Sequence, residues 1–484
     1  MQIKTIIRLL GILLMLFSCS MLTPLIINAV FAESFQAPFT ASFSCTFLTG
    51  FIAWYCFKNE HRELKIRDGF LIVALFWLVC CFFASLPFLF AIHHHAASIT
   101  DAFFESVSGF TTTGATIINH VEKLPHAILY YRQQLQFLGG MGIVVLAVAI
   151  LPMLGVGGMQ LYRAETPGPM KDSKLTPRIA QTAKALWSIY LALTIACMIC
   201  YRLAGMHWFD AIGESFATVS TGGFSMHTSN FSYYQSTSIE CIACLFMLLG
   251  GTNFALHFYA IQKKSLIHYW QDEEFKSYLL FLTFSAGIVM IGLYFLDPLA
   301  LTKDKIMHCA FNVISMVTTT GLVAERFNQW PSYIPIFIML ISVIGGCAAS
   351  TSGGIKVLRA LLITKQSRRE ITRLLHPNAI IPIKFGKNTC PEPVLQSMWA
   401  FISVFIGLFF ILLIAFMALG NDFLTSFSAI ISALANSGTG LGSVSDNFSH
   451  INILSKWVLI FAMIAGRLEI FSLLILFSTH FWEK

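Results

Sequence analysis

Long apolar stretches alternate with short polar segments along almost the whole chain. Each stretch approaches or exceeds the roughly 20 residues that a helix needs to cross the hydrocarbon core of a membrane. The first stretch follows Lys4 and Arg8 and is longer than the apolar core of a secretory signal, so we expect an uncleaved helix. The pattern predicts ten spans, at residues 9–31, 38–57, 69–92, 128–155, 181–204, 236–262, 276–298, 332–363, 396–420 and 452–481.

Four shorter segments between these spans are rich in glycine, threonine and serine, and are too short and too polar to cross a membrane. Non-helical backbone is tolerated at membrane depth only where protein buries it or water lines it. We therefore predict four re-entrant loops, at residues 99–119, 208–227, 305–323 and 422–443.

Composition and charge support a membrane protein and indicate its orientation. Hydrophobic residues make up 56% of the chain and charged residues 11%, against roughly 25% charged residues in soluble domains. A soluble globular enzyme and a disordered chain are both excluded. The basic residues cluster in loops that the positive-inside rule places in the cytoplasm together with the N-terminus. All four polar segments then lie on the outer side. The clusters occupy residues 58–67, 163–184, 263–276 and 356–387.

The four polar segments form an internal repeat. The segment from Asp101 to Gly114 aligns without gaps with that from Asp210 to Gly223, and shares Asp, Ala, Glu, Ser, Thr and Gly with it. The third ends in Thr-Thr-Thr-Gly321, and the fourth, Asn-Ser-Gly438, is the most divergent. The repeat unit is a span, a short half-helix, a loop and a second span. The predicted fold is an all-α polytopic membrane protein, with four pseudo-repeats around a central pore after a two-span hairpin. The predicted units are 1–68 (hairpin), 69–180, 181–275, 276–395 and 396–484.

This arrangement suits a cation. The carbonyl end of a half-helix is the negative end of its dipole, and glycine permits conformations that turn carbonyl groups inward. A ring of carbonyls can replace the hydration shell of a monovalent cation. A single Thr-Thr-Gly is more readily explained as an ordinary turn, but four copies at one topological position favour a selectivity filter. The predicted filter residues are Thr112, Thr113, Gly114, Thr221, Gly222, Gly223, Thr319, Thr320, Gly321, Asn436, Ser437 and Gly438.

The span 332–363 is interrupted by ten residues without a large side chain. Glycine costs about 1 kcal/mol in a helix interior, so a continuous helix is disfavoured, although small residues also mark close helix contacts. We favour an unwound loop on the cytoplasmic side of the filter, acting as a movable gate. Its candidate residues are Gly345, Gly346, Ser350, Gly353 and Gly354, with Lys356 two residues after the last of them.

Several polar residues lie within apolar stretches. Arg467 shares a span with Glu469, and an ionisable residue at this depth is a functional candidate, the alternative being a structural ion pair. Glu105 and Glu214 hold equal positions before the first two loops. They either raise the cation concentration at the outer mouth or hydrogen-bond buried backbone and hydroxyl groups. We expect Arg132, Asn253 and His257 to serve in packing or partner contacts, and His93–His95 to lie in a solvated loop.

Six motifs occur in order along the chain, at residues 108–116, 131–136, 157–165, 345–356, 376–378 and 466–471. Together they resemble the Trk/Ktr/HKT superfamily of potassium transporters, and in particular the membrane subunits of bacterial Trk systems, over essentially the whole chain. The resemblance implies filter glycines at Gly114, Gly223, Gly321 and Gly438. A glycine in the first loop goes with potassium selectivity in this family, so Gly114 favours potassium. The fourth loop departs from the expected Asn-Leu-Gly-Pro-Gly.

The resemblance also implies a mechanism and partners. It implies potassium uptake across the bacterial inner membrane, driven by the membrane potential, with Arg467 in the pore below the filter. It implies a homodimer and a cytosolic A-type regulatory subunit that binds NAD and ATP or ADP. This chain contains neither a dinucleotide fingerprint nor a Walker A loop, so we expect potassium as the only bound metal ion, no other cofactor here, no nucleic-acid partner and no enzymatic activity.

Two alternatives remain open. An alternating-access carrier, for a cation or for a solute coupled to protons or sodium, is the competing function. The basic stretch 365–387 is expected to contact either anionic lipids or the regulatory subunit.

Overall fold

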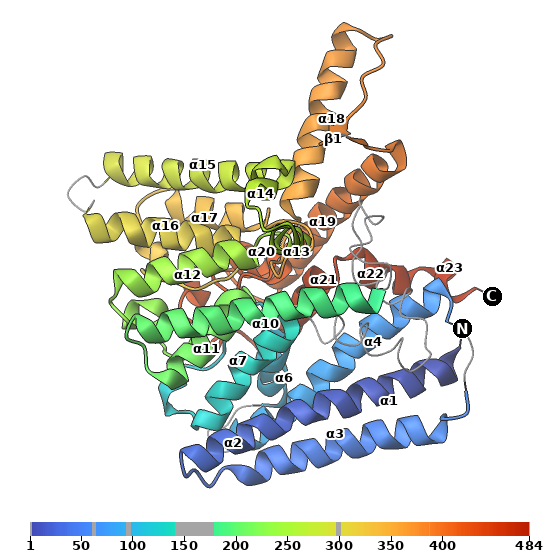
Figure 1. Ribbon diagram of the computed structural model, residues 1–484, viewed down its shortest axis with the longest axis vertical. Coiled ribbons are helices and arrows are strands. Elements are labelled where there is room, and N and C mark those ends of the chain that lie inside the picture. Colours follow the sequence, from blue (N-terminus) through green and yellow to red (C-terminus); the bar gives the residue numbers. More distant parts are fainter. Residues whose placement is uncertain are drawn as a thin grey trace.

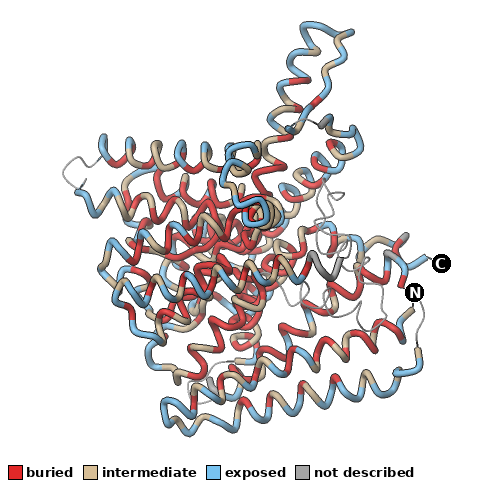
Figure 2. Tube along the Cα trace, in the orientation of Figure 1, coloured by how far each residue is buried: buried red, intermediate tan, exposed pale blue. Residues whose placement is uncertain are grey.

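The computed structural model describes residues 2–60, 64–92, 98–140, 179–296, 302–386 and 388–483. Most helices lie side by side in a bundle, and α18 projects from it together with a small hairpin (Figure 1). Buried residues concentrate in the middle of the bundle, whereas the outer helices carry exposed side chains (Figure 2). Within the described residues the strands are limited to β1 (Lys384–Phe385) and β2 (Asn388–Thr389), which pair antiparallel.

An N-terminal helical hairpin flanks the bundle. α1 (Ile3–Cys19) continues through the 3-10 turn Ser20–Leu22 into α2 (Thr23–Val30), and α3 (Gln36–Cys56) returns beside it. Gly11 and Gly50 face each other at the crossing, where a Cβ on Gly11 would lie 2.6 Å from the carbonyl oxygen of Gly50. Small residues thus let the two backbones approach closely, as is common between membrane helices.

Four repeats follow, and each contains one half-helix. The half-helices contain 12 to 15 residues, or roughly 18–23 Å at 1.5 Å per residue, which is shorter than the ~30 Å hydrocarbon core. The first repeat comprises α4 (Ile66–Ala84), α5 (Leu86–Ile92), α6 (Ile99–Phe110) and α7 (His126–Gly140), and the second comprises α10 (Ile179–Leu203), α11 (Trp208–Val219), α12 (Thr237–Gly250), α13 (Phe254–Lys263) and α14 (Ile267–Gln271). The third comprises α15 (Glu273–Leu296), α16 (Lys303–Val317), α17 (Ile334–Ser342) and α18 (Val357–Leu375). The fourth comprises α19 (Glu392–Ala418), α20 (Phe423–Ala435), α21 (Ile453–Arg467), α22 (Phe471–Leu474) and α23 (Thr479–Trp482).

Polar residues start three of the half-helices. Ser98 accepts a hydrogen bond from the backbone N–H of Asp101 at the start of α6, and Thr302 and Asp422 cap α16 and α20 in the same way. Such caps satisfy backbone donors that have no partner inside the helix. Short 3-10 turns continue the outer loops and the C-terminus, at Val121–Lys123, Asn230–Tyr233, Phe327–Gln329, Gly442–Val444 and Ile475–Phe477.

The described residues contain six helices long and apolar enough to cross a membrane, and two bent pairs. Two of the predicted spans, at 236–262 and 452–481, are each broken by a sharp bend. α12 and α13 meet at 96°, and α21 and Phe471–Phe477 meet at 108°. Asn253 caps α13 after the first break, and Glu469 and Ile470 have positive φ at the second.

Two further predictions concern the spans 332–363 and 128–155. The predicted interruption of 332–363 is confirmed, since α17 ends at Ser342 and α18 begins at Val357. The span predicted at 128–155 is described only up to Gly140. Its remainder, the motif at 157–165, most of the basic cluster 163–184 and the histidines 93–95 lie outside the described residues.

Candidate functional site

The four loops share one backbone conformation. Each loop contains a pair of positive-φ positions two residues apart, and the second member is always the glycine that the repeat alignment selected. The pairs, with φ of 52–55° at the first member and 72–84° at the second, are Thr112/Gly114, Thr221/Gly223, Thr319/Gly321 and Asn436/Gly438. Positive φ is uncommon outside glycine, so its fourfold recurrence at one spacing indicates one conformation used four times. The conformation distinguishes Gly223, which has positive φ, from its neighbour Gly222. The divergent fourth loop also adopts this conformation.

The loops meet in a closed ring. A Cβ built on Gly114 would lie well under 3.0 Å from the carbonyl oxygen of Gly222, the residue that precedes the next filter glycine. The same relation joins Gly223 to Thr320, Gly321 to Ser437, and Gly438 back to Thr113. Each glycine therefore leaves room for the carbonyl group of the following loop.

The ring is buried and lined by backbone carbonyl groups. The threonines at its positive-φ positions are at most 1% exposed. The half-helices end at the ring, so their negative dipole ends point to it. The described residues hold no group of three or more His, Cys, Asp or Glu side chains that could bind a metal ion. Carbonyl oxygens arranged in a ring are able to coordinate a cation.

Each half-helix also holds the outgoing part of its loop. Glu105 accepts a hydrogen bond from the N–H of Ile117 at 3.1 Å, three residues after the filter glycine. The corresponding acceptors in the other repeats are Glu214, Asn312 and Ser428, which receive the N–H groups of Met226, Ala324 and Leu441 at 2.8, 3.1 and 2.8 Å.

Only two of these four acceptors, Glu105 and Glu214, were candidates from the sequence alone. Glu105 and Glu214 are both 0% exposed, and of the two roles considered for them the structure places them in the hydrogen-bonding one. Asn312 lies nine residues before its filter glycine, as the two glutamates do, so counting back from Gly321 would have found it. Ser428 lies ten residues before Gly438 and escapes that count.

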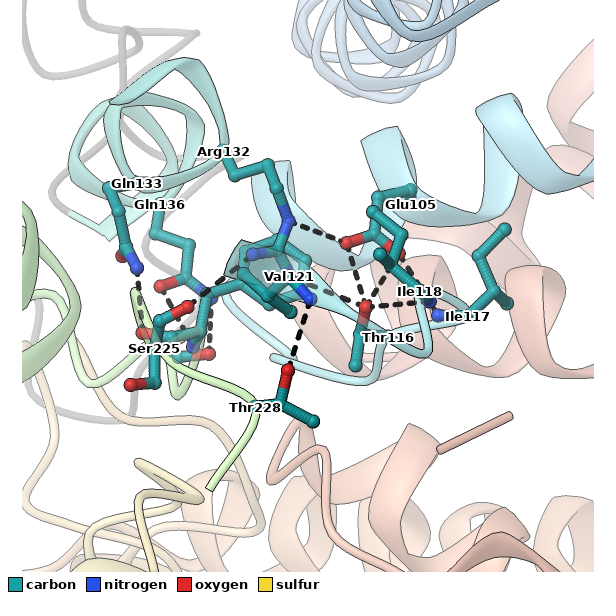
Figure 3. A network of polar contacts seen from close by, with 12 residues as sticks. Glu105, Thr116, Ile117, Ile118, Val121, Arg132, Gln133, Gln136, Ser225 and Thr228 are labelled. Atoms are coloured by element: carbon teal, nitrogen blue, oxygen red, sulfur yellow. Dashed lines mark hydrogen bonds and ion pairs between the residues drawn. The ribbon is translucent and has the colours of Figure 1, made fainter. Parts of the chain in front are cut away.

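Arg132 bridges the first two loops (Figure 3). Its Nε donates to Glu105 at 2.8 Å, and its guanidinium also donates to Thr116 Oγ1 at 3.2 Å and to the carbonyl of Ser225 at 3.4 Å. The guanidinium carbon lies 4.2 Å from the ring centre of Phe224. Arg132 was expected to serve mainly in packing or partner contacts, and its contacts support two loops at once.

Two further supports were not anticipated. On α7, Gln136 donates to the carbonyl oxygen of Gly222, a member of the ring, at 2.5 Å and accepts from the N–H of Phe224 at 3.2 Å. The side chain of Asn436 donates to Thr113 Oγ1 at 2.9 Å, which joins the fourth loop to the first. The sequence around these two amides does not reveal their partners, because the partners are distant in sequence.

The gate loop (residues 343–356) packs against the inner ends of the filter loops. The N–H of Gly353 donates to Thr319 Oγ1 at 2.7 Å, and a Cβ on Gly353 would collide with the carbonyl oxygen of Ala435. Thr351 Oγ1 donates to the carbonyl of Val219 at 3.1 Å. The loop thus touches the second, third and fourth repeats below the ring.

The gate loop is also fixed at its sides. The N–H of Cys347 donates to the carbonyl of Gly251, at the bend between α12 and α13, at 2.8 Å. Of the predicted gate residues, Gly345 and Gly354 have positive φ, as does Lys356. Gly346 packs on Gly251, and Ser350 Oγ donates to Cys347 within the loop.

Arg467 ties the gate loop to the end of α7. Its guanidinium donates to the carbonyl oxygen of Thr351 at 2.9 Å and to those of Gly139 and Gly140 at 2.5 and 2.7 Å. Glu469 pairs instead with Arg359 on α18. Lys356 donates to the carbonyl of Ser352 within the loop.

Away from the ring, the two other polar residues of the predicted spans have local contacts. Asn253 caps α13, and His257 lies 2.9 Å from the carbonyl oxygen of Leu249 and 2.7 Å from the hydroxyl of Tyr269. They form part of the bend and not of the ring.

Fold and site together define a multi-pass membrane protein whose four re-entrant loops close one carbonyl ring. Residues 36–484 match the family model TrkH, described as cation transport protein, and the chain belongs to this family. It is 47% identical to the Trk system potassium uptake protein TrkH of Halomonas elongata and 46% to that of Escherichia coli, covering 100% of each chain. The crystal structure of the potassium transporter TrkH from Vibrio parahaemolyticus superposes with a TM-score of 0.91, at 44% identity, covering 100% of both chains. The resemblance seen in the motifs is thus confirmed.

Proposed function

We propose that this protein takes up potassium into the bacterial cytoplasm through the carbonyl ring of its four loops. The observation that carries the proposal is the closed circle in which each filter glycine abuts the carbonyl of the next loop. Four repeated sets of oxygen atoms replace the hydration shell of a monovalent cation. The names of the full-length relatives support potassium as the ion.

Transport in this proposal is passive and follows the membrane potential, which supplies about 2.3 kcal/mol per charge per 100 mV. The ring needs to stay rigid so that it fits potassium better than sodium. The network behind it supports that rigidity, because Arg132, Gln136 and Asn436 each hold one loop to another element by hydrogen bonds. No covalent step is involved.

The gate loop closes the pathway below the ring. Arg467 places a positive charge beneath the filter, which opposes a cation at that position, and its hydrogen bonds hold the loop across the pore. Opening therefore requires the loop to leave Thr319 and Arg467. Lys356 fixes the end of the loop from which α18 starts.

The cytoplasmic partner binds, in this proposal, to the arm, which we define as residues 364–391. The arm exposes Ile371, Leu374, Leu375 and Ile380, at 63, 83, 76 and 95%. Apolar side chains at this exposure favour a protein surface, here the A-type subunit with its NAD and ATP or ADP sites. The basic residues of the arm also suit anionic lipids. A homodimer in the inner membrane, with a cytoplasmic N-terminus, completes the proposal.

Cation flux into liposomes containing the purified protein tests this function against the carrier alternative. We expect an imposed voltage, negative inside, to drive potassium and rubidium uptake without a proton or sodium gradient. Uptake that ignores voltage and requires one of these gradients would overturn the passive mechanism in favour of the carrier.

A further inference from the structure

Three consecutive acidic residues start α15 at the cytoplasmic side. Asp272 accepts a hydrogen bond from the N–H of Phe275 at 2.7 Å, and negative side chains are favourable at a helix N-terminus. Helix capping therefore accounts for Asp272. The next two residues make contacts outside their own helix, with two different parts of the protein.

Glu274 holds the gate loop. Its Oε1 accepts a hydrogen bond from the N–H of Ala348 at 2.6 Å, and its side chain is buried, with 3% of the residue exposed. The neighbouring Ala349 has a φ of 54°, so this part of the loop cannot satisfy its N–H groups within a helix. A buried N–H needs an acceptor, and Glu274 supplies it from a neighbouring helix.

Glu273 holds the arm. One carboxylate oxygen pairs with Lys365 on α18, and the other accepts from the N–H of Gly386 at 2.8 Å. Lys365 in turn donates to the carbonyl oxygen of Lys384, in β1, at 2.8 Å. Glu273 therefore binds both the helix and the hairpin of the arm, which project from the bundle beside α14 and α15 (Figure 1).

We propose that Glu273 and Glu274 form a coupling site through which the position of the arm controls the gate loop. The proposal rests on the proposed function, in which the loop at 343–356 closes the pore. α18 begins where the gate loop ends, so a displaced arm pulls on the loop directly and also, through Glu273, on the helix turn that carries Glu274. Coupling between sites needs such a shared element that both sites bias.

The surface chemistry of the arm indicates what would displace it. Arg368 and the apolar side chains of Ile371, Leu374 and Leu375 are exposed. A protein partner that combines acidic and apolar groups matches this surface. Such a partner would open the gate without touching the filter.

Rubidium flux in liposomes tests the coupling. We expect Glu274→Ala and Glu273→Ala each to raise voltage-driven flux severalfold, with an unchanged rubidium-to-sodium ratio. The effects on flux should be non-additive in the double variant, because both substitutions disrupt the same coupling between the arm and the gate loop. Glu60→Ala is the matched control, since Glu60 pairs with Lys4 in the N-terminal hairpin, and it should leave flux unchanged. Folded Glu273 and Glu274 variants that conduct like the wild type would overturn the proposal.

Hydrogen–deuterium exchange of the peptide covering the gate loop provides a second measurement, independent of flux. Faster exchange in Glu273→Ala than in the wild type is expected, although Glu273 itself contacts only the arm. Unchanged exchange in Glu273→Ala would refute the coupling. This result does not depend on whether Glu274→Ala folds. A wild type that conducts no rubidium would count against the proposed function alone, since the exchange result still decides the coupling.

Discussion

Arg132 and Glu105 form an ion pair at 2.8 Å inside the protein, with side chains 1% and 0% exposed. The pair lies behind the first filter loop and reaches the second through Ser225. Removing one partner of a buried pair leaves an uncompensated charge, which costs about 3–5 kcal/mol. We predict that Arg132→Met lowers the thermal unfolding temperature of the purified protein markedly.

Arg326→Met is the control for this prediction. Arg326 pairs with Asp446 at the surface, with side chains 64% and 60% exposed, and exposed pairs contribute about 0–1 kcal/mol. Similar unfolding temperatures for the two variants would show that the Arg132 pair is not the support inferred here.

Two adjacent glycines allow a matched test of the second loop. A Cβ on Gly223 would collide with the backbone carbonyl of Thr320, and Gly223 has a φ of 83°. A Cβ on Gly222 meets the side chain of Gln136 instead, so it displaces a support of the second loop and not the backbone of the third. We predict that Gly223→Ala lowers the potassium-to-sodium flux ratio more than Gly222→Ala does. The reverse order would contradict the repeat alignment.

Asn312 offers a test of the third loop. Its side chain binds the N–H of Ala324 and the carbonyl of Glu325 at 3.1 and 2.8 Å, so Asn312→Ala should cost about 1–3 kcal/mol for the unsatisfied groups and also reduce ion selectivity. Asn28→Ala removes a comparable buried hydrogen bond, to Phe35 in the N-terminal hairpin. It should lower stability while leaving the potassium-to-sodium flux ratio intact. Equal ratios in both variants would contradict a role for Asn312 in holding the filter.

Arg467 provides a test of the gate. We predict that Arg467→Gln raises potassium flux at a fixed voltage with unchanged selectivity, because the loop loses its tie to α7 and the pore loses a positive charge. Arg202→Gln removes an arginine that also donates to a backbone carbonyl, that of Met206, outside the gate. It should not alter flux. A fall in flux for folded Arg467→Gln would contradict the gate assignment.

The spans and the repeat could be predicted from the sequence because they depend on local composition. The length of an apolar run predicts the length of a helix. The alignment of Asp210–Gly223 with the first polar segment predicts that the unit is repeated. The bends at Gly251 and Glu469 could not be predicted, because the interrupting residues are few and lie within long apolar runs. The interruption before Val357 involves ten small residues and was therefore visible.

The supporting residues of the site were mostly missed for a related reason. Gln136 and Asn436 owe their roles to partners 86 and 323 residues away, and such pairings depend on how the repeats close into a ring. A single sequence contains the repeat but not the order of the loops around the axis. Asn312 was also missed but could have been found, since the repeat register alone places it at the position equivalent to Glu105.

Ion selectivity of Gly114→Ser tests the central claim most directly. Gly114 has a φ of 84°, and a Cβ there would collide with the carbonyl of Gly222, so the ring has to distort. Gly407→Ser is the control, because nothing lies within 4 Å of a Cβ at Gly407. With voltage-driven flux measured in liposomes for potassium, rubidium, sodium and lithium, we predict that sodium enters through Gly114→Ser but not through the wild type or Gly407→Ser. An unchanged preference for potassium in a conducting Gly114→Ser protein would contradict the filter.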